Sequence, residues 1–251
     1  MAGTRSLPSP SVLRRAHNIY IDDLWKSDGW GCTQWRGYSA QMLFWYGVAG
    51  APYAGGSDLA DRYLASIVGK RKISGVPLAK LKLWKSANRL VNDIRRETGM
   101  ELVPWLAQTR IDSAWERLQQ VYLIGPKIAS WFLRDISFLM DYRIDARPSR
   151  FSYGQQRSSK WFATLSPDVM KYFVPIDRWV FIGAKKIGAL RPKSIRLTVQ
   201  GIQANRRNHL QAASEIVEFA QRRNLDPRDL NAYWFMVGSK WIDGNGKQPP
   251  S

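Results

Sequence analysis

The residues with the clearest chemical use follow a tight turn near the middle of the chain. Residues 115–140 read as an amphipathic helix, a Leu-Ile-Gly-Pro turn and a second, apolar helix. Gly125 is expected to give this turn its backbone freedom, and Pro126 suits the first position of the second helix. The free amides at that helix end favour an anion, and Lys127 stands beside them. The pattern predicts a phosphate site, with an ordinary helical hairpin as the alternative.

The net charge of the chain favours a phosphate-bearing partner. The 251 residues include 38 Lys and Arg against 20 Asp and Glu, which gives a formal charge of +18 and a pI near 10.3. Residues 69–92 hold seven basic and no acidic side chains, and residues 178–214 hold eight and none. Such an excess normally serves a polyanion, so we predict nucleic acid rather than a membrane surface. A solvated helix face is the alternative for each run.

The scarcity of cysteine and histidine excludes several classes of protein. Cys32 is the only cysteine and there are two histidines, which rules out a disulfide scaffold, a Cys-rich zinc site and a four-Cys iron–sulfur cluster. We predict neither a metal nor a cofactor. No signal peptide or membrane span is visible, so we expect an intracellular protein of the cytoplasm or nucleoid.

The elements that must position these residues are predicted to be helices alone. Apolar residues recur with helical spacing and no segment alternates with period two. The expected helices begin at Pro10, run through Met42 to Tyr46, and cover residues 57–68, 77–98, 112–121, 126–140, 177–187, 208–223 and 227–241. Residues 141–165, rich in Arg, Ser, Gly and Pro, are predicted to be an inserted loop.

Three segments resemble the helix-hairpin-helix (HhH-GPD) DNA glycosylase superfamily. The run from Gly125 to Asp135 is most similar to the archaeal-type 8-oxoguanine DNA glycosylases with AP lyase activity. Residues 174–180 resemble the family element in which an Asp opens a helix, and residues 229–238 resemble its final helix. The resemblance spans about half of the chain, residues 112–240. Its departures are Leu123 in place of the first hairpin Gly, Trp179 in place of a common His, and a longer Lys-to-Asp connection.

The resemblance implies a fold and an activity. The fold would be a single unit over residues 1–251, with two helical subdomains, 57–140 and 1–56 plus 166–251, and a DNA-binding cleft between them. The activity would be base excision repair, in which the enzyme removes an oxidised base, with 8-oxoguanine first and a larger modified base as the alternative. Lys127 matches the Schiff-base nucleophile, whose neutral amine attacks C1′ before β-elimination. Asp177 matches the carboxylate that stabilises the cationic sugar.

Other residues are assigned to the base pocket and to DNA contact. Trp131 lies one turn after Lys127, where the resembling enzymes stack an aromatic ring on the flipped base, and Trp234 and Phe235 are candidates for the opposing face. Core packing is the alternative for all three, because the chain has twelve Trp. DNA contact is predicted for Leu123, Ile124, Gly125, Arg147, Arg150 and Arg157, and the aromatic Trp161 of the insertion is a candidate wedge.

Simpler interpretations of the two proposed catalytic side chains stay open. Lys127 alone is also what a phosphate contact would need, and Asp177 alone is a good helix N-cap. The competing class of protein is a noncatalytic DNA-binding module, and structured RNA is a further possible ligand. The expected partner is double-stranded DNA with a damaged base, bound by a monomer.

Overall fold

The described part of the chain is entirely helical. The computed structural model describes residues 7–26, 39–50, 56–68, 76–141 and 161–240. Within these ranges it contains thirteen α-helices and no strand, which confirms the predicted all-α class. The helices are α1 (Pro10–Lys26), α2 (Ser39–Ala49), α3 (Gly56–Val68), α4 (Leu78–Thr98), α5 (Leu102–Gln108), α6 (Ile111–Leu118), α7 (Pro126–Asp141), α8 (Pro167–Met170), α9 (Arg178–Lys186), α10 (Pro192–Ile195), α11 (Val199–Ala204), α12 (Arg206–Gln221) and α13 (Pro227–Gly238). Two short 3₁₀ turns, η2 (Phe162–Thr164) and η3 (Lys171–Phe173), flank α8.

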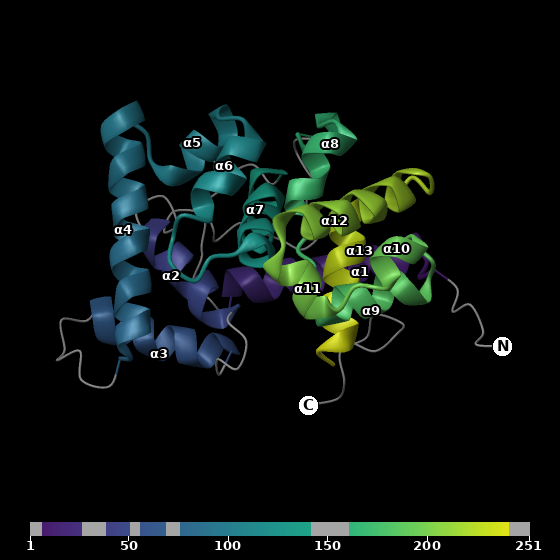
Figure 1. Ribbon diagram of the computed structural model, residues 1–251, viewed down its shortest axis with the longest axis horizontal. Helices are drawn as coiled ribbons and strands as arrows, with labels where there is room; N and C mark the ends of the chain where they lie inside the picture. Colours follow the sequence, from purple (N-terminus) through teal and green to yellow (C-terminus); the bar gives the residue numbers. More distant parts are fainter. Residues whose placement is uncertain (1–6, 27–38, 51–55, 69–75, 142–160, 241–251) are drawn as a thin grey trace.

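Helix α7 lies at the centre of the arrangement (Figure 1). On one side α2 packs against α3 and α4, and on the other α1 packs against α13, which also packs against α9. Helix α7 contacts α2 and α6 on the first side and α11, α12 and η3 on the second. Helix α7, whose first turn carries Lys127, therefore contacts both groups of helices. None of the described helices is long and apolar enough to cross a membrane.

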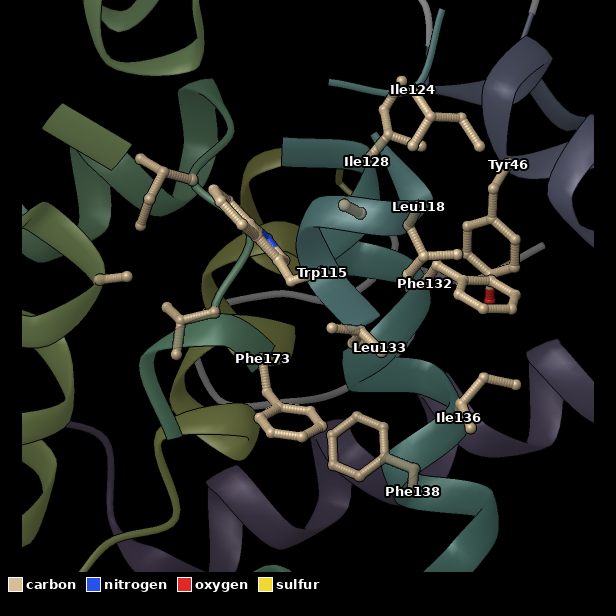
Figure 2. Packing of buried hydrophobic residues seen from close by; sticks show 14 of the residues in the cluster. Tyr46, Trp115, Leu118, Ile124, Ile128, Phe132, Leu133, Ile136, Phe138 and Phe173 are labelled. Atoms are coloured by element: carbon tan, nitrogen blue, oxygen red, sulfur yellow. The ribbon is translucent and has the colours of Figure 1, made fainter. Parts of the chain in front are cut away.

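The core gathers around one face of α7. Figure 2 shows Phe132, Leu133 and Ile136 of this helix among the buried side chains, with Phe138 facing Phe173 of η3. All five are at most 2% exposed. Burying an aliphatic or aromatic side chain contributes roughly 1.5–3 kcal/mol, so this contact fixes α7 firmly between its neighbours.

Most predicted helix boundaries agree with the structure to within a few residues. Helix α4 ends at Thr98, as expected, because Gly99 adopts the left-handed conformation with φ 71°. The short helix α5 was not predicted: its Pro104 resembles a helix breaker in the sequence. In the structure Pro104 is the third residue of α5, where its missing N–H has no intrahelical partner to lose.

The predicted insertion overlaps the described chain only at its ends. Residues 142–160, which include Arg147, Arg150 and Arg157, lie outside the described residues, so their predicted DNA contacts stay predictions. The C-terminal end of the segment, at Trp161 and Phe162, packs against the protein rather than forming a surface loop. The ring of Trp161 packs edge-on against Phe173 with centroids 5.9 Å apart, and the adjoining Phe162 is 2% exposed. Phe162 thus belongs to the core and Trp161 packs against it, whereas Ala163 and Thr164 are exposed.

Candidate functional site

The turn between α6 and α7 is built around Leu123. Leu123 has φ 68°, in the left-handed region, whereas Gly125 has no positive φ and a Cβ there would meet nothing within 4 Å. The prediction that Gly125 supplies the backbone freedom is therefore wrong. Leu123 takes that conformation, which costs a residue with a Cβ roughly 1–2 kcal/mol. Of the predicted contact residues, Leu123 is 38% exposed, while Ile124 is 3% exposed and packs in the core.

Helix α7 begins with backbone amides that have no hydrogen-bond partner within the helix. Its first backbone hydrogen bond runs from the Ala129 N–H to the Gly125 carbonyl, 3.0 Å away. The preceding amides of Lys127 and Ile128 therefore lack an intrahelical partner, as at any helix start. This end of α7 has the polarity that an anion requires.

Lys127 points back toward the end of α2. Its Nζ donates a hydrogen bond of 2.6 Å to the carbonyl of Gly50. A Cβ at Gly50 would lie 2.9 Å from Cγ1 of Ile128, so the glycine lets the two helix ends approach closely. Burial lowers the pKa of Lys127, and the nearby carboxylate of Asp177 opposes that shift. The amine is thus closer to its neutral, nucleophilic form than an exposed lysine would be.

Asp177 caps the first turn of α9. Its Oδ1 accepts a hydrogen bond of 2.7 Å from the Val180 N–H, which confirms the N-cap interpretation. Burial raises the pKa of Asp177, while the Val180 hydrogen bond and the charges of Lys127 and Arg134 oppose that rise. The structure therefore brings Lys127 and Asp177, 50 residues apart in the sequence, close enough to shift each other's pKa.

The segment that leads to Asp177 is fixed by side chains of two other helices. Asn231 of α13 donates from Nδ2 to the Pro175 carbonyl, at 2.8 Å. Gln203 of α11 donates from Nε2 to the Ile176 carbonyl, at 3.1 Å. Two successive carbonyls are therefore held immediately before Asp177, and the position of its carboxylate depends on α9, α11 and α13 together.

A buried charge network lies seven residues along α7 from Lys127. Arg134 donates from Nε to Asp135 Oδ1 at 2.9 Å, and its two Nη groups donate to the side-chain Oδ1 of Asn231 and to the Tyr20 hydroxyl. Asp135 Oδ2 accepts from the hydroxyls of Tyr20 and Tyr46, each at 2.7 Å. Burial of Arg134, which is 2% exposed, lowers its pKa, but the Asp135 carboxylate and the Tyr20 hydroxyl outweigh burial and raise the pKa above its ordinary value. The network keeps a fixed positive charge near Asp177.

The aromatic residues predicted for the base pocket are divided between two places. Trp131 is half-buried, donates from Nε1 to the Tyr20 hydroxyl at 3.0 Å, and lies 6.4 Å from the ring of Phe235. Trp234 is 5% exposed and packs on α9, where a Cβ at Gly183 would come within 2.4 Å of its ring. The structure thus brings Trp131 and Phe235 together, while Trp234 serves the contact between α13 and α9.

A buried histidine adjoins the same cluster. Burial and the nearby charge of Lys127 lower the pKa of His209 to about 3. Its Nε2 lies 3.1 Å from the hydroxyl of Ser130, which accepts a hydrogen bond of 2.8 Å from Trp115 Nε1. His209 is therefore neutral at physiological pH and adds no charge beside the amine.

The sequence interpretation missed Arg134, Asp135 and Asn231. A signal for the first two was present, because adjacent opposite charges inside the apolar run of residues 126–141 must find buried partners. Asn231 gave no local signal. Its partners lie on α7 and beside Asp177, which only the tertiary structure brings to it.

Comparison with known proteins adds no relative. No protein-family model, curated protein or solved structure matches this chain. The functional assignment therefore depends on the residues and their geometry.

Proposed function

We propose that the protein is a DNA glycosylase with AP lyase activity that removes an oxidised base from duplex DNA. The first candidate for this base is 8-oxoguanine. The observation that carries the proposal is the pairing of Lys127 with Asp177. Burial lowers the pKa of the amine and raises that of the carboxylate, and the two side chains lie at the starts of α7 and α9. Perturbed pairs of this kind are typical of catalytic sites.

The chemistry divides between the two side chains. The neutral Nζ of Lys127 attacks C1′, the C1′–N bond breaks, and the base leaves with the bonding electrons and takes up a proton. The carboxylate of Asp177 stabilises the positive charge that develops on the sugar. Opening of the sugar ring then gives a Schiff base on Lys127. Loss of the C2′ proton expels the 3′ phosphate and cuts the strand.

The proposed organisation follows from the same elements. Helices α6 and α7 with their turn would form the helix-hairpin-helix motif. The helices on the two sides of α7, with α2, α3 and α4 on one side and α1, α9 and α13 on the other, would form two subdomains with the DNA between them. Trp131 and Phe235 would border the flipped base, because they lie together on α7 and α13. The Arg134 network would fix this border and the segment before Asp177 in one arrangement.

Borohydride trapping tests the proposal. A duplex with one 8-oxoguanine should give a covalent protein–DNA adduct, whereas Lys127→Gln should give none. Lys80→Gln is the matched control, since burial also lowers the pKa of Lys80, which lies on α4 away from the proposed site. An undiminished adduct with Lys127→Gln would show that the nucleophile is another residue. Duplexes with larger modified bases in the same assay decide the substrate.

A noncatalytic DNA-binding protein is the second candidate. One observation favours it: both side chains already have a structural hydrogen bond. Lys127 donates to the Gly50 carbonyl, and Asp177 accepts from the Val180 amide. Tight binding to every duplex, without excision of any base or a trapped adduct, would establish this second function and overturn the first.

A further inference from the structure

The two ends of α4 differ in whether their cations form ion pairs within the protein. Toward its C-terminus, Arg96 pairs with Asp93 at 2.8 Å, and Glu97 pairs with Arg117 of α6 at 2.7 Å. Arg95 pairs with Glu101. This end of the helix is therefore close to neutral, and its cations are occupied within the protein.

The N-terminal part of α4 carries cations without such partners. Lys82, Lys85 and Arg89 are exposed, and none of them forms an ion pair within the described part of the chain. No acidic residue precedes Asp93 in this helix. Residues three, four and seven apart lie on one side of a helix, so the three cations form a single stripe. Leu83 and Leu90 occupy the buried side.

The turn between α6 and α7 docks beside this stripe. The Tyr122 N–H donates a hydrogen bond of 3.0 Å to the hydroxyl of Ser86. Ser86 lies four residues after Lys82 and three before Arg89, and therefore neighbours both cations on the helix surface. The exposed tip of the turn, with Tyr122 43% and Leu123 38% exposed, is thereby fixed next to the cations. Exposed apolar side chains beside unpaired cations form a surface suited to a nucleic-acid backbone and sugar edge.

We propose that Lys82, Lys85 and Arg89 extend the DNA contact expected at the turn, whose tip carries Tyr122 and Leu123, along the N-terminal part of α4, and that the five residues form one docking surface. This docking surface binds successive phosphates on duplex DNA that flanks the damaged base. The inference rests on the proposed function for the identity of the polyanion. The pairing at the other end of α4 limits the surface to the N-terminal part of the helix, next to the turn.

The dimensions of the stripe fit a duplex. From Lys82 to Arg89 the helix rises about 10 Å, at 1.5 Å per residue. The phosphates of one DNA strand follow each other every 3.4 Å or so along the axis, so the stripe matches about three nucleotides. Three phosphate contacts would contribute about 2.7 units to the slope of log affinity against log salt concentration.

The salt dependence of binding to an undamaged duplex tests the surface. The variant Lys82→Gln/Lys85→Gln/Arg89→Gln should bind more weakly and lower the salt slope by up to about 2.7. The matched control, Arg95→Gln/Arg96→Gln/Arg117→Gln, loses the same net charge from cations that are already paired. It should keep most of the slope. Thermal melting of both variants establishes that each is folded when its binding is measured.

Single-turnover excision separates this inference from the proposed function. At saturating DNA and low salt, the stripe variant should excise the base at the wild-type rate, because its cations do not touch the reacting atoms. Normal excision with an unchanged salt slope would overturn the docking surface and leave the glycosylase proposal intact. Binding without excision by the wild type would refute the glycosylase alone. Loss of binding to anionic phospholipid vesicles, with duplex binding unaffected, would assign the stripe to a membrane and overturn the inference.

Discussion

The first turn of α7 and the middle of α7 each bury one cation, and the pKa values of the two cations shift in opposite directions. Lys127 and Arg134 are seven residues apart and share one side of the helix. Arg134 is bound by a carboxylate, a hydroxyl and an amide oxygen, and its pKa rises. Lys127 is bound by one carbonyl, and its pKa falls. Burial alone does not decide the charge of a cation; the number and kind of its partners do.

This difference lets Lys127 and Arg134 serve different roles beside Asp177. Both cations oppose the rise in the pKa of the Asp177 carboxyl that burial causes. If Lys127 gives up its proton to become a nucleophile, Asp177 loses one of these two supports. Arg134 cannot be deprotonated under the same conditions, so it continues to favour the carboxylate. The proposed reaction needs this combination of a neutral amine and an ionised carboxyl.

The largest expected effect is on the stability of the Arg134 variant. Arg134→Met leaves Asp135 buried without its cation and should reduce the free energy of unfolding by about 3–5 kcal/mol. Lys127→Met should cost less, about 1–3 kcal/mol, because the thioether fills a similar volume and only the Gly50 carbonyl loses its donor. Urea denaturation followed by circular dichroism measures both. Equal losses in the two variants would contradict the comparison.

The next effect is on the chemical step. Asp177→Asn should slow base excision about 100-fold or more, while lesion-DNA affinity stays equal or rises. Asparagine caps a helix about as well as aspartate, so the melting temperature should change little. Single-turnover excision and fluorescence anisotropy give the two quantities. A protein that excises normally but melts earlier would mean that Asp177 serves only as the cap of α9.

The third prediction concerns pH. Borohydride trapping on a preformed abasic site bypasses base removal and depends on the neutral amine of Lys127. The trapping rate should rise with pH and level off above a midpoint lower than the ordinary lysine value of 10.5, because burial lowers the pKa. Asp177→Asn should move the midpoint further down, since the lost carboxylate no longer raises that pKa. A midpoint that moves upward would show that the two groups are not coupled as described.

The smallest effects are expected in the turn that leads into α7. Leu123→Gly removes the cost of a left-handed leucine and, after the added chain entropy of glycine, should stabilise the protein by about 0.5 kcal/mol. Gly125→Ala should also be tolerated, with a gain of about 0.4–1 kcal/mol, because its Cβ meets open space. Thermal melting of the pair provides the measurement. A strongly destabilised Gly125→Ala protein would mean that Gly125, rather than Leu123, has the positive-φ conformation.

Local features of the site were predictable from the sequence. The start of α7 at Pro126 and the cap at Asp177 depend on residues within one turn of each other, and both agree with the structure. The hairpin glycine was misassigned because a Gly-Pro pair marks a turn without stating which of its residues has positive φ. Here the strained position fell two residues earlier, on Leu123.

Long-range features were not predictable. The carbonyl that binds Lys127 belongs to Gly50, 77 residues away, and the amide that holds Pro175 belongs to Asn231, 56 residues away. The choice between Phe235 and Trp234 as neighbour of Trp131 depends on the rotation of α13 about its axis. Adjacent residues point about 100° apart, so only packing against α9 and α1 settles it.

The hydrogen bond between Trp131 and Tyr20 affects how a substrate could be selected. Tyr20 is held by Arg134, which also binds Asn231 beside the segment before Asp177, so Trp131 is bonded to a fixed partner and must break that bond to move. One wall of the proposed pocket is thus preformed and held in a fixed position. A base of the wrong outline would be refused by shape before any chemistry began, and tolerance for larger bases would have to come from the opposite wall.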